Sequence, residues 1–379
     1  PIVCWPRAGR DRGTTVAAAG GMTRSPPAGW IRRQLTSHPH VALFGLAFGY
    51  FASYVPYSAI TKALTSQAVR GDAALAGLAL LPATTLASLV AMVATITALG
   101  WWRYARPPGR RWPRPGRWTL LSGIATAMIV LSTTLAYTFE GVSLPFVMLI
   151  MRGGVLVLAP IVDLLSARRI RWFSWGAVAL SLLSLANAFA ARPGAVPALC
   201  AIDLGLYLGS YFLRLRLMAR LGKSDDPAVR RRYFVEEQMV ATPAALLGLA
   251  VLAVVAPIAV RAPLRDGFAA LDLSATTGWA VLAGVCSQGT GVFGGLLLLD
   301  AHEASYCVPL NRAASILGGV AAAIGLAQVF ATPWPSGWEL AGAGVLLLAI
   351  ALLWIGPLVP RRADARARWW NIGCKPSPP

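Results

Sequence analysis

The chain has 379 residues, of which 56% are hydrophobic and only 13% are charged. Its mean hydropathy is +0.61. This composition excludes an ordinary soluble globular protein and is typical of a protein that crosses a membrane several times. A formal net charge of +19 would indicate nucleic-acid binding in a soluble protein. Here the basic residues fall in the gaps between apolar runs, so they indicate a basic cytoplasmic face, and we expect no nucleic-acid partner.

Ten apolar runs follow one another along the chain. Each is close to or above the roughly 20 residues that a helix needs to cross a bilayer. Because the backbone must satisfy its own hydrogen bonds in lipid, runs of this length predict helices. The predicted helices span about 41–61, 74–100, 118–138, 142–165, 172–191, 195–218, 237–260, 277–299, 305–330 and 338–357. The fold class that we expect is an all-α integral membrane protein with ten transmembrane helices.

The lysines and arginines predict the orientation of these helices. The N-terminal tail, every second loop and the C-terminal tail together carry 27 of them, whereas the intervening loops carry five. Basic residues are enriched in cytoplasmic loops, so we expect a multi-pass protein of a bacterial inner membrane with both termini cytoplasmic. Residues 1–40 form a disordered basic tail in this interpretation, and residues 358–379 form a basic cytoplasmic tail. The eighth–ninth loop is an exception, because it carries Asp300, His302 and Glu303 but no basic residue.

The two halves of the chain, 41–191 and 195–357, resemble each other at offsets of 157 to 161 residues. The matched segments are Tyr50–Tyr54 with Tyr207–Tyr211, Pro82–Leu86 with Pro243–Leu247, Leu121–Gly123 with Leu282–Gly284, and Arg152 with Arg312. These matches occur in the same order in both halves and predict an internal duplication. Five helices per half is an odd number, so the second copy enters the membrane from the opposite side. Inverted repeats of this kind are typical of secondary transporters, whose substrate site lies near the midplane.

These features resemble the drug/metabolite transporter superfamily, and within it the EamA-like permeases. The resemblance rests on ten helices with both ends inside, on the 5+5 repeat, and on the similar openings of the last helix in each half, at Trp175-Gly176 and Trp338–Gly342. The pattern Met151–Gly154 and the basic turn after that helix are similar to the nucleotide-sugar and chloroquine-resistance-type branch. The resemblance covers residues 41–357 and implies a permease for small metabolites. Asn311 stands before Arg312 where some members carry a lysine, which argues against a sugar phosphate.

Arg152 and Arg312 are the strongest candidate site residues. Each lies inside an apolar run, where an arginine costs about 2.5–3.5 kcal/mol on insertion scales and needs a partner, water or a function. A guanidinium group binds carboxylates and phosphates through a fork of two donors. Two such groups, one from each half, would bind an anionic substrate, and the neighbouring Asn311 would contribute to the same site. The alternative is that each arginine pairs with an internal acid, or bonds to backbone carbonyls, and only fixes the packing of the helices.

Asp203 is an acid well inside an apolar run. Tyr207, Ser210 and Tyr211 follow it at helical spacing and share its face. In a functional role, Asp203 takes a proton or a cationic group during coupling, and Tyr207 and Tyr211 contact the substrate. The alternative is a permanent ion pair between Asp203 and an arginine.

Tyr50, Tyr54 and Tyr57 form a stripe along the first predicted helix. Such a stripe supplies aromatic faces and hydroxyls to a substrate cavity, and we place Tyr50 and Tyr54 in the predicted site. An ordinary packing face or an interfacial face would give the same pattern.

The sequence favours a secondary active transporter for a small metabolite with a carboxylate or phosphate group. The alternative is an exporter of amines, aromatic compounds or drugs, because one acid and several tyrosines suit a cation equally well. A membrane enzyme or a channel is less favoured, since the chain has no nucleotide-binding loop, no Ser/His/Asp set and no selectivity filter. None of the five cysteines forms a C-x-x-C pair, and we expect no metal and no cofactor. The expected partners are the substrate and the lipid bilayer, and both a monomer and a homodimer remain open.

Overall fold

We describe the protein from a computed structural model, in which residues 39–66, 75–106, 112–136, 144–190, 198–271, 275–330, 334 and 337–356 are described. Within these ranges the chain is helical, with turns and short extended links and no β-strand. The two predicted basic tails lie outside the described residues, apart from Pro39 and His40 at the start of the first helix. The described residues from Leu43 onward form one compact unit, and the description below concerns that unit.

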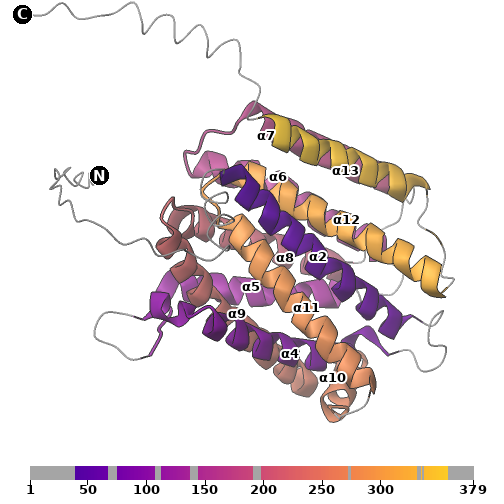
Figure 1. Cartoon of the computed structure of the whole chain (residues 1–379). Helices are drawn as coiled ribbons and strands as arrows, with labels where there is room; N and C mark the ends of the chain where they lie inside the picture. The colour runs from indigo at the N-terminus through magenta and orange to yellow at the C-terminus, as the bar shows by residue number, and fades with distance from the viewer. Residues whose placement is uncertain are drawn as a thin grey trace, which may run out of the picture. The chain divides into compact units, whose positions relative to one another are not determined.

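Ten long helices account for the predicted apolar runs (Figure 1). They are α2 (Pro39–Thr65), α4 (Gly77–Ala98), α5 (Arg117–Ala136), α6 (Leu144–Leu165), α7 (Trp172–Ala190), α8 (Ala198–Leu217), α9 (Pro227–Val255), α11 (Ala275–Leu298), α12 (Ala304–Phe330) and α13 (Gly337–Ile355). Nine of them begin and end within about four residues of the prediction, as expected for boundaries read from a sequence. The predicted start of α9 was wrong, because this helix begins ten residues earlier, at Pro227.

Five of the described helices are long and apolar enough to cross a membrane by length and composition: α2, α4, α9, α11 and α12. Shorter apolar stretches occupy parts of α5, α7 and α13. The protein is therefore all-α in its described part, and its long apolar helices are those of a multi-pass membrane protein.

Three further elements lie in the connections. A 3₁₀ turn, η2 (Trp101–Ala105), follows α4, and a π-helical turn, η3 (Met218–Gly222), extends α8. The short helix α10 (Ile258–Ala269) was not predicted, since its charged residues made it look like a loop. It packs against α4 and α9.

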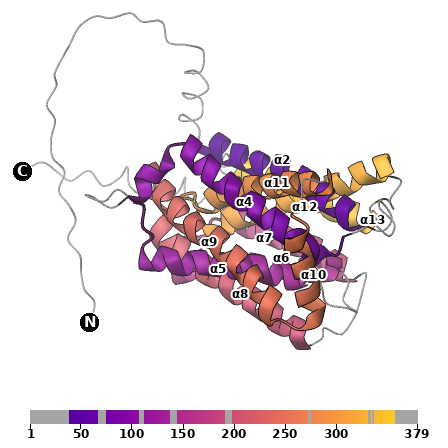
Figure 2. The same ribbon diagram turned by 90° about the horizontal axis from the view of Figure 1, so that it is seen from below.

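Most of the closely packed helix pairs join helices that are not consecutive in the sequence (Figures 1 and 2). Helix α5 lies against α8 and α9, α4 lies against α9 and α11, and α13 lies against α7 and α12. Glycines permit two of these close approaches. A Cβ atom on Gly123 of α5 would meet the Val240 side chain of α9, and one on Gly284 of α11 would meet Ala87 of α4. Small residues at such contacts are typical of helix packing in membranes.

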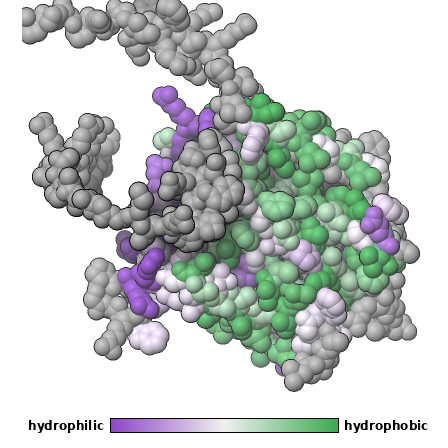
Figure 3. Space-filling view, in the orientation of Figure 1, coloured by the Kyte–Doolittle hydropathy of each residue, from purple (hydrophilic) through white to green (hydrophobic). Residues whose placement is uncertain are grey.

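The outer surface of the bundle is largely apolar. Figure 3 shows a broad apolar face over the helices at the front, with the hydrophilic residues gathered toward one edge. Large side chains such as Ile202, Leu247 and Val254 are more than 60% exposed. Apolar exposure on this scale would promote aggregation in water and fits a surface that faces lipid.

Candidate functional site

Arg152 of α6 and Arg312 of α12 make the same type of contact with a tyrosine. The Nη2 atom of Arg152 donates a hydrogen bond to Tyr54 Oη over 2.5 Å, and the guanidinium carbon lies 5.5 Å from the ring centroid. The Nη2 atom of Arg312 donates to Tyr211 Oη over 3.0 Å, with its guanidinium carbon 5.3 Å from the ring. In both pairs the phenol oxygen accepts a hydrogen bond from the guanidinium group. Each arginine–tyrosine pair is therefore a set of donors suited to an anion.

Ser315 connects the two arginines. Its hydroxyl accepts a hydrogen bond of 2.7 Å from Arg152 Nη1 and donates one of 2.8 Å to the backbone oxygen of Arg312. Arg152 from α6 thus reaches the same turn of α12 that carries Arg312. The structure brings together the two arginines that were predicted to act as a pair.

Arg312 is only 8% exposed. Its Nη2 atom also donates to Asn311 Oδ1 over 2.7 Å, whereas its Nε atom is buried without a hydrogen-bond partner. Within the described ranges no carboxylate forms an ion pair with Arg312, so the alternative of a neutralising internal acid is not realised for this residue. A buried donor without a partner costs about 1–3 kcal/mol, and an anionic ligand would remove that cost.

The tyrosine stripe of α2 lies beside the arginines. The Tyr50 and Tyr54 rings stack with centroids 5.9 Å apart, and Tyr57 continues the row at 5.9 Å from Tyr54. Tyr50 is close enough to interact electrostatically with both Arg152 and Arg312. The stripe therefore supplies one wall of the candidate site.

Asp203 lies on the buried face of α8 with Tyr207, Ser210 and Tyr211, as the spacing predicted. The Tyr207 and Tyr211 ring centroids are 4.9 Å apart. Asp203 is 7% exposed, and its Oδ2 atom has no hydrogen-bond partner. In the described part of the chain it forms no ion pair, so the permanent Asp203–arginine pair is not observed there.

Sequence reasoning missed a second buried polar cluster, centred on Glu237 of α9. Glu237 is fully buried and binds Arg214 of α8 through two hydrogen bonds, of 2.8 Å and 3.1 Å. Ser122 and Thr126 of α5 donate to the same carboxylate over 2.7 Å and 3.0 Å. The missed signal is the dipeptide Asp226-Pro227, since an N-cap acid followed by proline at the first helical position marks a helix start.

The acidic loop that interrupted the basic pattern is explained by its partners. Arg171 forms an ion pair with Glu303, and Arg230 forms one with Asp300, at 2.9 Å and 2.8 Å. Arg231 donates to Tyr104 of η2 over 2.9 Å. Four loops that were predicted to lie on one side thus meet at one end of the bundle, which we call the basic end.

Two carboxylates at the basic end have lowered pKa values. Burial raises the pKa of Glu303, but hydrogen bonds from Arg171 and Ser174 outweigh burial and hold it below the ordinary value of 4.5. Burial also raises the pKa of Asp300, and its contacts with His302 outweigh that effect and hold it below 3.8. Both groups are therefore charged at neutral pH, and their ion pairs persist.

Gly294 of α11 gives room to the tyrosine wall. A Cβ atom there would lie 2.7 Å from Tyr50 Cε2 and 3.1 Å from Asn311 Nδ2. We expect Gly294→Ala to destabilise the protein by about 1–3 kcal/mol, as other overpacking substitutions do. Gly205→Ala is the matched control, because nothing lies within 4 Å of a Cβ at that position. Thermal unfolding followed by tryptophan fluorescence measures both variants, and equal melting temperatures would contradict the close contact.

No group of three or more histidine, cysteine, aspartate or glutamate residues that would hold a metal ion occurs in the part of the chain that the structure describes. The side chains gathered at the candidate site are guanidinium groups, phenols, an amide and a carboxylate. Groups of these kinds can form hydrogen bonds to a polar ligand.

Comparison with known proteins shows the fold alone. No family model matches the chain, and no curated protein matches it. Among solved structures, one described as "Crystal structure of protein" superimposes with a TM-score of 0.55 at 14% sequence identity. The match covers 82% of this chain and 96% of that one. The helical arrangement is thus similar to that of a protein of known structure, over nearly the whole length of that protein.

Proposed function

We propose that this chain is a secondary active transporter, a permease or exporter that moves a small metabolite with a carboxylate or phosphate group across a bacterial inner membrane. In this proposal it belongs to the drug/metabolite transporter superfamily, has ten transmembrane helices as two inverted five-helix repeats, keeps both termini in the cytoplasm and performs no enzymatic reaction. The observation that carries the proposal is the buried Arg312, whose Nε atom lacks a partner beside two arginine–tyrosine pairs.

The inverted repeat is supported by contacts that the two halves share. Arg152 contacts Tyr54 and Arg312 contacts Tyr211, and these are the residues that the sequence matches at offsets of 160 and 157. In the repeat, α5 of the first half is equivalent to α11 of the second, and α4 is equivalent to α9. The pair α5–α9 is therefore equivalent to the pair α11–α4, and both pairs are closely packed. Such halves rock against each other in alternating access, around a site near the midplane.

The chemistry of the site favours an anion. Charge-assisted hydrogen bonds from guanidinium groups to carboxylates or phosphates are short and strong, and arginine suits them because its donors form a planar fork. An anion at Arg312 would satisfy the Nε donor, next to the Nη2 atom that already contacts Tyr211. The bond between Arg312 and Asn311 Oδ1 holds the guanidinium in place until the substrate enters.

Asp203 is the proposed coupling residue. Its buried carboxylate has an oxygen without a partner, and it lies two turns before Tyr211 on the same face of α8. A carboxylate in this setting takes up a proton readily, because burial disfavours its charged form. Proton binding at Asp203 and substrate binding at Arg312 would then communicate through α8.

A thermal-shift panel on the detergent-purified protein tests the substrate class. A ligand that binds only the folded state stabilises it by RT ln(1 + [L]/Kd), which is about 2.7 kcal/mol at a hundredfold excess over Kd. We expect carboxylates and phosphates to raise the melting temperature, and matched neutral amides and primary amines of the same size to leave it unchanged. A panel in which no anion shifts the melting temperature overturns the proposed substrate class.

The alternative proposal is an exporter of amines, aromatic compounds or drugs. The unpartnered oxygen of Asp203 and the five tyrosine rings around it and the arginines favour this alternative. It predicts that cationic aromatic compounds, and not anions, raise the melting temperature in the same panel. A channel would conduct without accumulating its substrate, and an enzyme would release a product, so flux assays separate both from a transporter.

A further inference from the structure

Asp163, near the C-terminal end of α6, caps the N-terminus of α12. Its carboxylate is fully buried and accepts hydrogen bonds from the backbone nitrogens of Ala304 and Ser305, at 2.8 Å and 2.7 Å, and from the Ser305 hydroxyl at 2.7 Å. A carboxylate at this position satisfies N–H groups that have no partner within the helix and interacts well with the helix dipole. Because Asp163 belongs to α6 and its partners to α12, the cap joins the first half of the chain to the second.

A second cap runs in the opposite direction. Glu236 of α9, in the second half, is 2% exposed and accepts a hydrogen bond of 2.9 Å from the Gly116 nitrogen at the start of α5, in the first half. Thr119 of α5 donates to the same carboxylate over 2.6 Å. Each half thus supplies a carboxylate to a helix N-terminus of the other half, at the same end of the bundle.

Polar contacts of two nearby arginines accompany the Asp163 cap. Arg171, in the turn after α6, binds Glu303 through hydrogen bonds of 2.9 Å and 3.0 Å, and Ser174 donates to the same carboxylate over 2.6 Å. Arg168 donates to the backbone oxygen of Ala301 over 3.0 Å. These contacts also join the first half to the second, through the residues that directly precede the capped ones.

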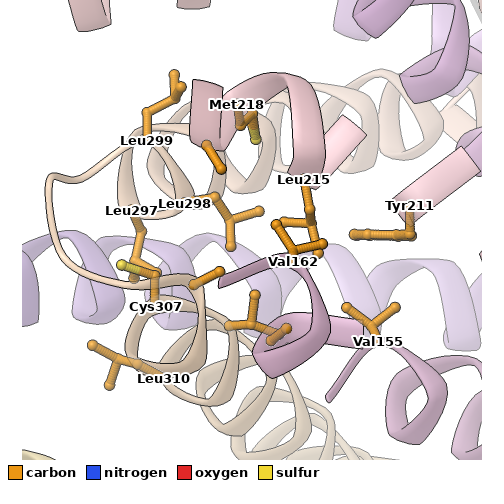
Figure 4. Packing of buried hydrophobic residues seen from close by; sticks show 14 of the residues in the cluster. Val155, Val162, Tyr211, Leu215, Met218, Leu297, Leu298, Leu299, Cys307 and Leu310 are labelled. Atoms are coloured by element: carbon orange, nitrogen blue, oxygen red, sulfur yellow. The ribbon is translucent and has the colours of Figure 1, made fainter. Parts of the chain in front are cut away.

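An apolar layer lies between these polar contacts and the arginine site. It consists of Val162, Leu215, Met218, Leu297, Leu298, Leu299 and Leu310, each at most 3% exposed. Figure 4 shows Val162 of α6 next to Leu215 of α8. Leu297, Leu298 and Leu299, from the end of α11 and the turn after it, lie to the left of these two residues in this view. Leu215 of α8 and Met218 of η3 follow Tyr211 by about one and two turns. The basic end is therefore closed above the site by a packed apolar layer that both halves share.

We infer that Asp163 and its cap on α12 form the latch of a gate at the basic end, and that the substrate site communicates with this side only after the latch is released. The inference rests on the proposed function and assigns the gate of that same site. Asp163 follows Arg152 by three turns on α6, and Ser305 precedes Arg312 by two turns on α12. The cap consequently fixes α12 against α6. The contact of Arg152 with Ser315 joins the same two helices, so the cap holds this contact in place as well. Release of the cap frees α12 to move, which separates the arginines and parts the apolar layer.

The buried thiol of Cys307 reports on this movement. It is fully buried in the first turns of α12, with its Sγ atom 3.5 Å from Lys223 Nζ. In the full-length protein with Cys4, Cys200, Cys286 and Cys374 replaced by serine, N-ethylmaleimide would react with Cys307 only when the gate opens. We expect Asp163→Ala to raise the labelling rate about tenfold, the factor that corresponds to loss of a typical helix cap. Glu303→Gln, which loosens the adjacent ion pair, is expected to raise the rate by a smaller factor.

Asp226→Ala is the matched control. Asp226 also caps a helix at the basic end, through a 2.8 Å hydrogen bond to its Oδ1 atom from the Ala228 nitrogen, but donor and acceptor belong to the same half. We expect this variant to label at the parent rate. Equal labelling of the Asp163 and Asp226 variants, or no increase in either Asp163→Ala or Glu303→Gln, overturns the latch. If Asp163→Ala does not fold, the labelling rate of Glu303→Gln is compared with that of Asp226→Ala. A higher rate in Glu303→Gln supports the latch, and equal rates overturn it. Labelling needs no substrate, so failure of the latch is read independently of the anion panel.

Discussion

Glu237→Ala is expected to lower the free energy of unfolding by about 3–5 kcal/mol, because it leaves the Arg214 guanidinium buried without its counter-ion. Arg214 is 7% exposed and Glu237 is fully buried. The substitution also removes the acceptor of the Ser122 hydroxyl, which adds an unsatisfied donor in α5. Thermal unfolding in detergent, followed by tryptophan fluorescence, measures the loss.

The double variant Arg214→Met with Glu237→Leu distinguishes the removal of one partner, which leaves a buried charge alone, from the replacement of the whole ion pair. Replacing a whole buried ion pair with apolar residues of similar volume is often neutral or stabilising, so we expect the double variant to recover most of the loss. Asp225→Ala is the control at an exposed acid, where substitutions usually change stability by less than about 0.5 kcal/mol. A single Glu237→Ala variant as stable as the Asp225→Ala control would show that the pair does not hold α5, α8 and α9 together.

The helices were predictable because each is a long apolar run with a clear end. The error at α9 has a physical cause. Its first eleven residues carry Arg230, Arg231, Arg232 and two glutamates, so they look like a basic loop when hydropathy alone is used. These residues are helical because Asp226 caps the helix, and the glutamates are buried because α5 and α8 supply partners for them. A single sequence does not reveal partners that lie about a hundred residues away.

The candidate site was predictable in its residue types but not in its pairings. Burial of charge inside apolar runs identified Arg152, Arg312 and Asp203. The sequence did not show that the guanidinium groups contact Tyr54 and Tyr211, because those contacts depend on how α2 packs against α6 and α8 against α12. It also did not show the gate at the basic end, since a helix cap supplied by a distant helix leaves no local pattern. Position within an apolar run therefore singled out these residues, and packing determined which side chains they contact.

Arg312→Leu is expected to abolish stabilisation by anions while leaving the ligand-free protein as stable as the parent, or more stable. The buried Nε atom has no partner, so its removal eliminates an unsatisfied donor and a desolvated charge. A hydrogen bond to a charged group contributes about 1.5–3 kcal/mol, and each 1.4 kcal/mol is tenfold in affinity. We therefore expect at least about a tenfold rise in Kd, measured by titrating the best anion of the panel against the melting temperature.

Arg261→Leu is the matched control for this variant. Arg261 of α10 also has a buried Nε atom without a hydrogen-bond partner, but it lies in a connecting helix that packs against α4 and α9 and carries none of the site residues. Its substitution is expected to leave the anion response intact. Arg312→Lys separates charge from geometry, because lysine keeps the charge and loses the planar fork. If Arg312→Leu lowers the stability of the ligand-free protein and keeps the full anion response, Arg312 holds α8 against α12, and the substrate binds elsewhere.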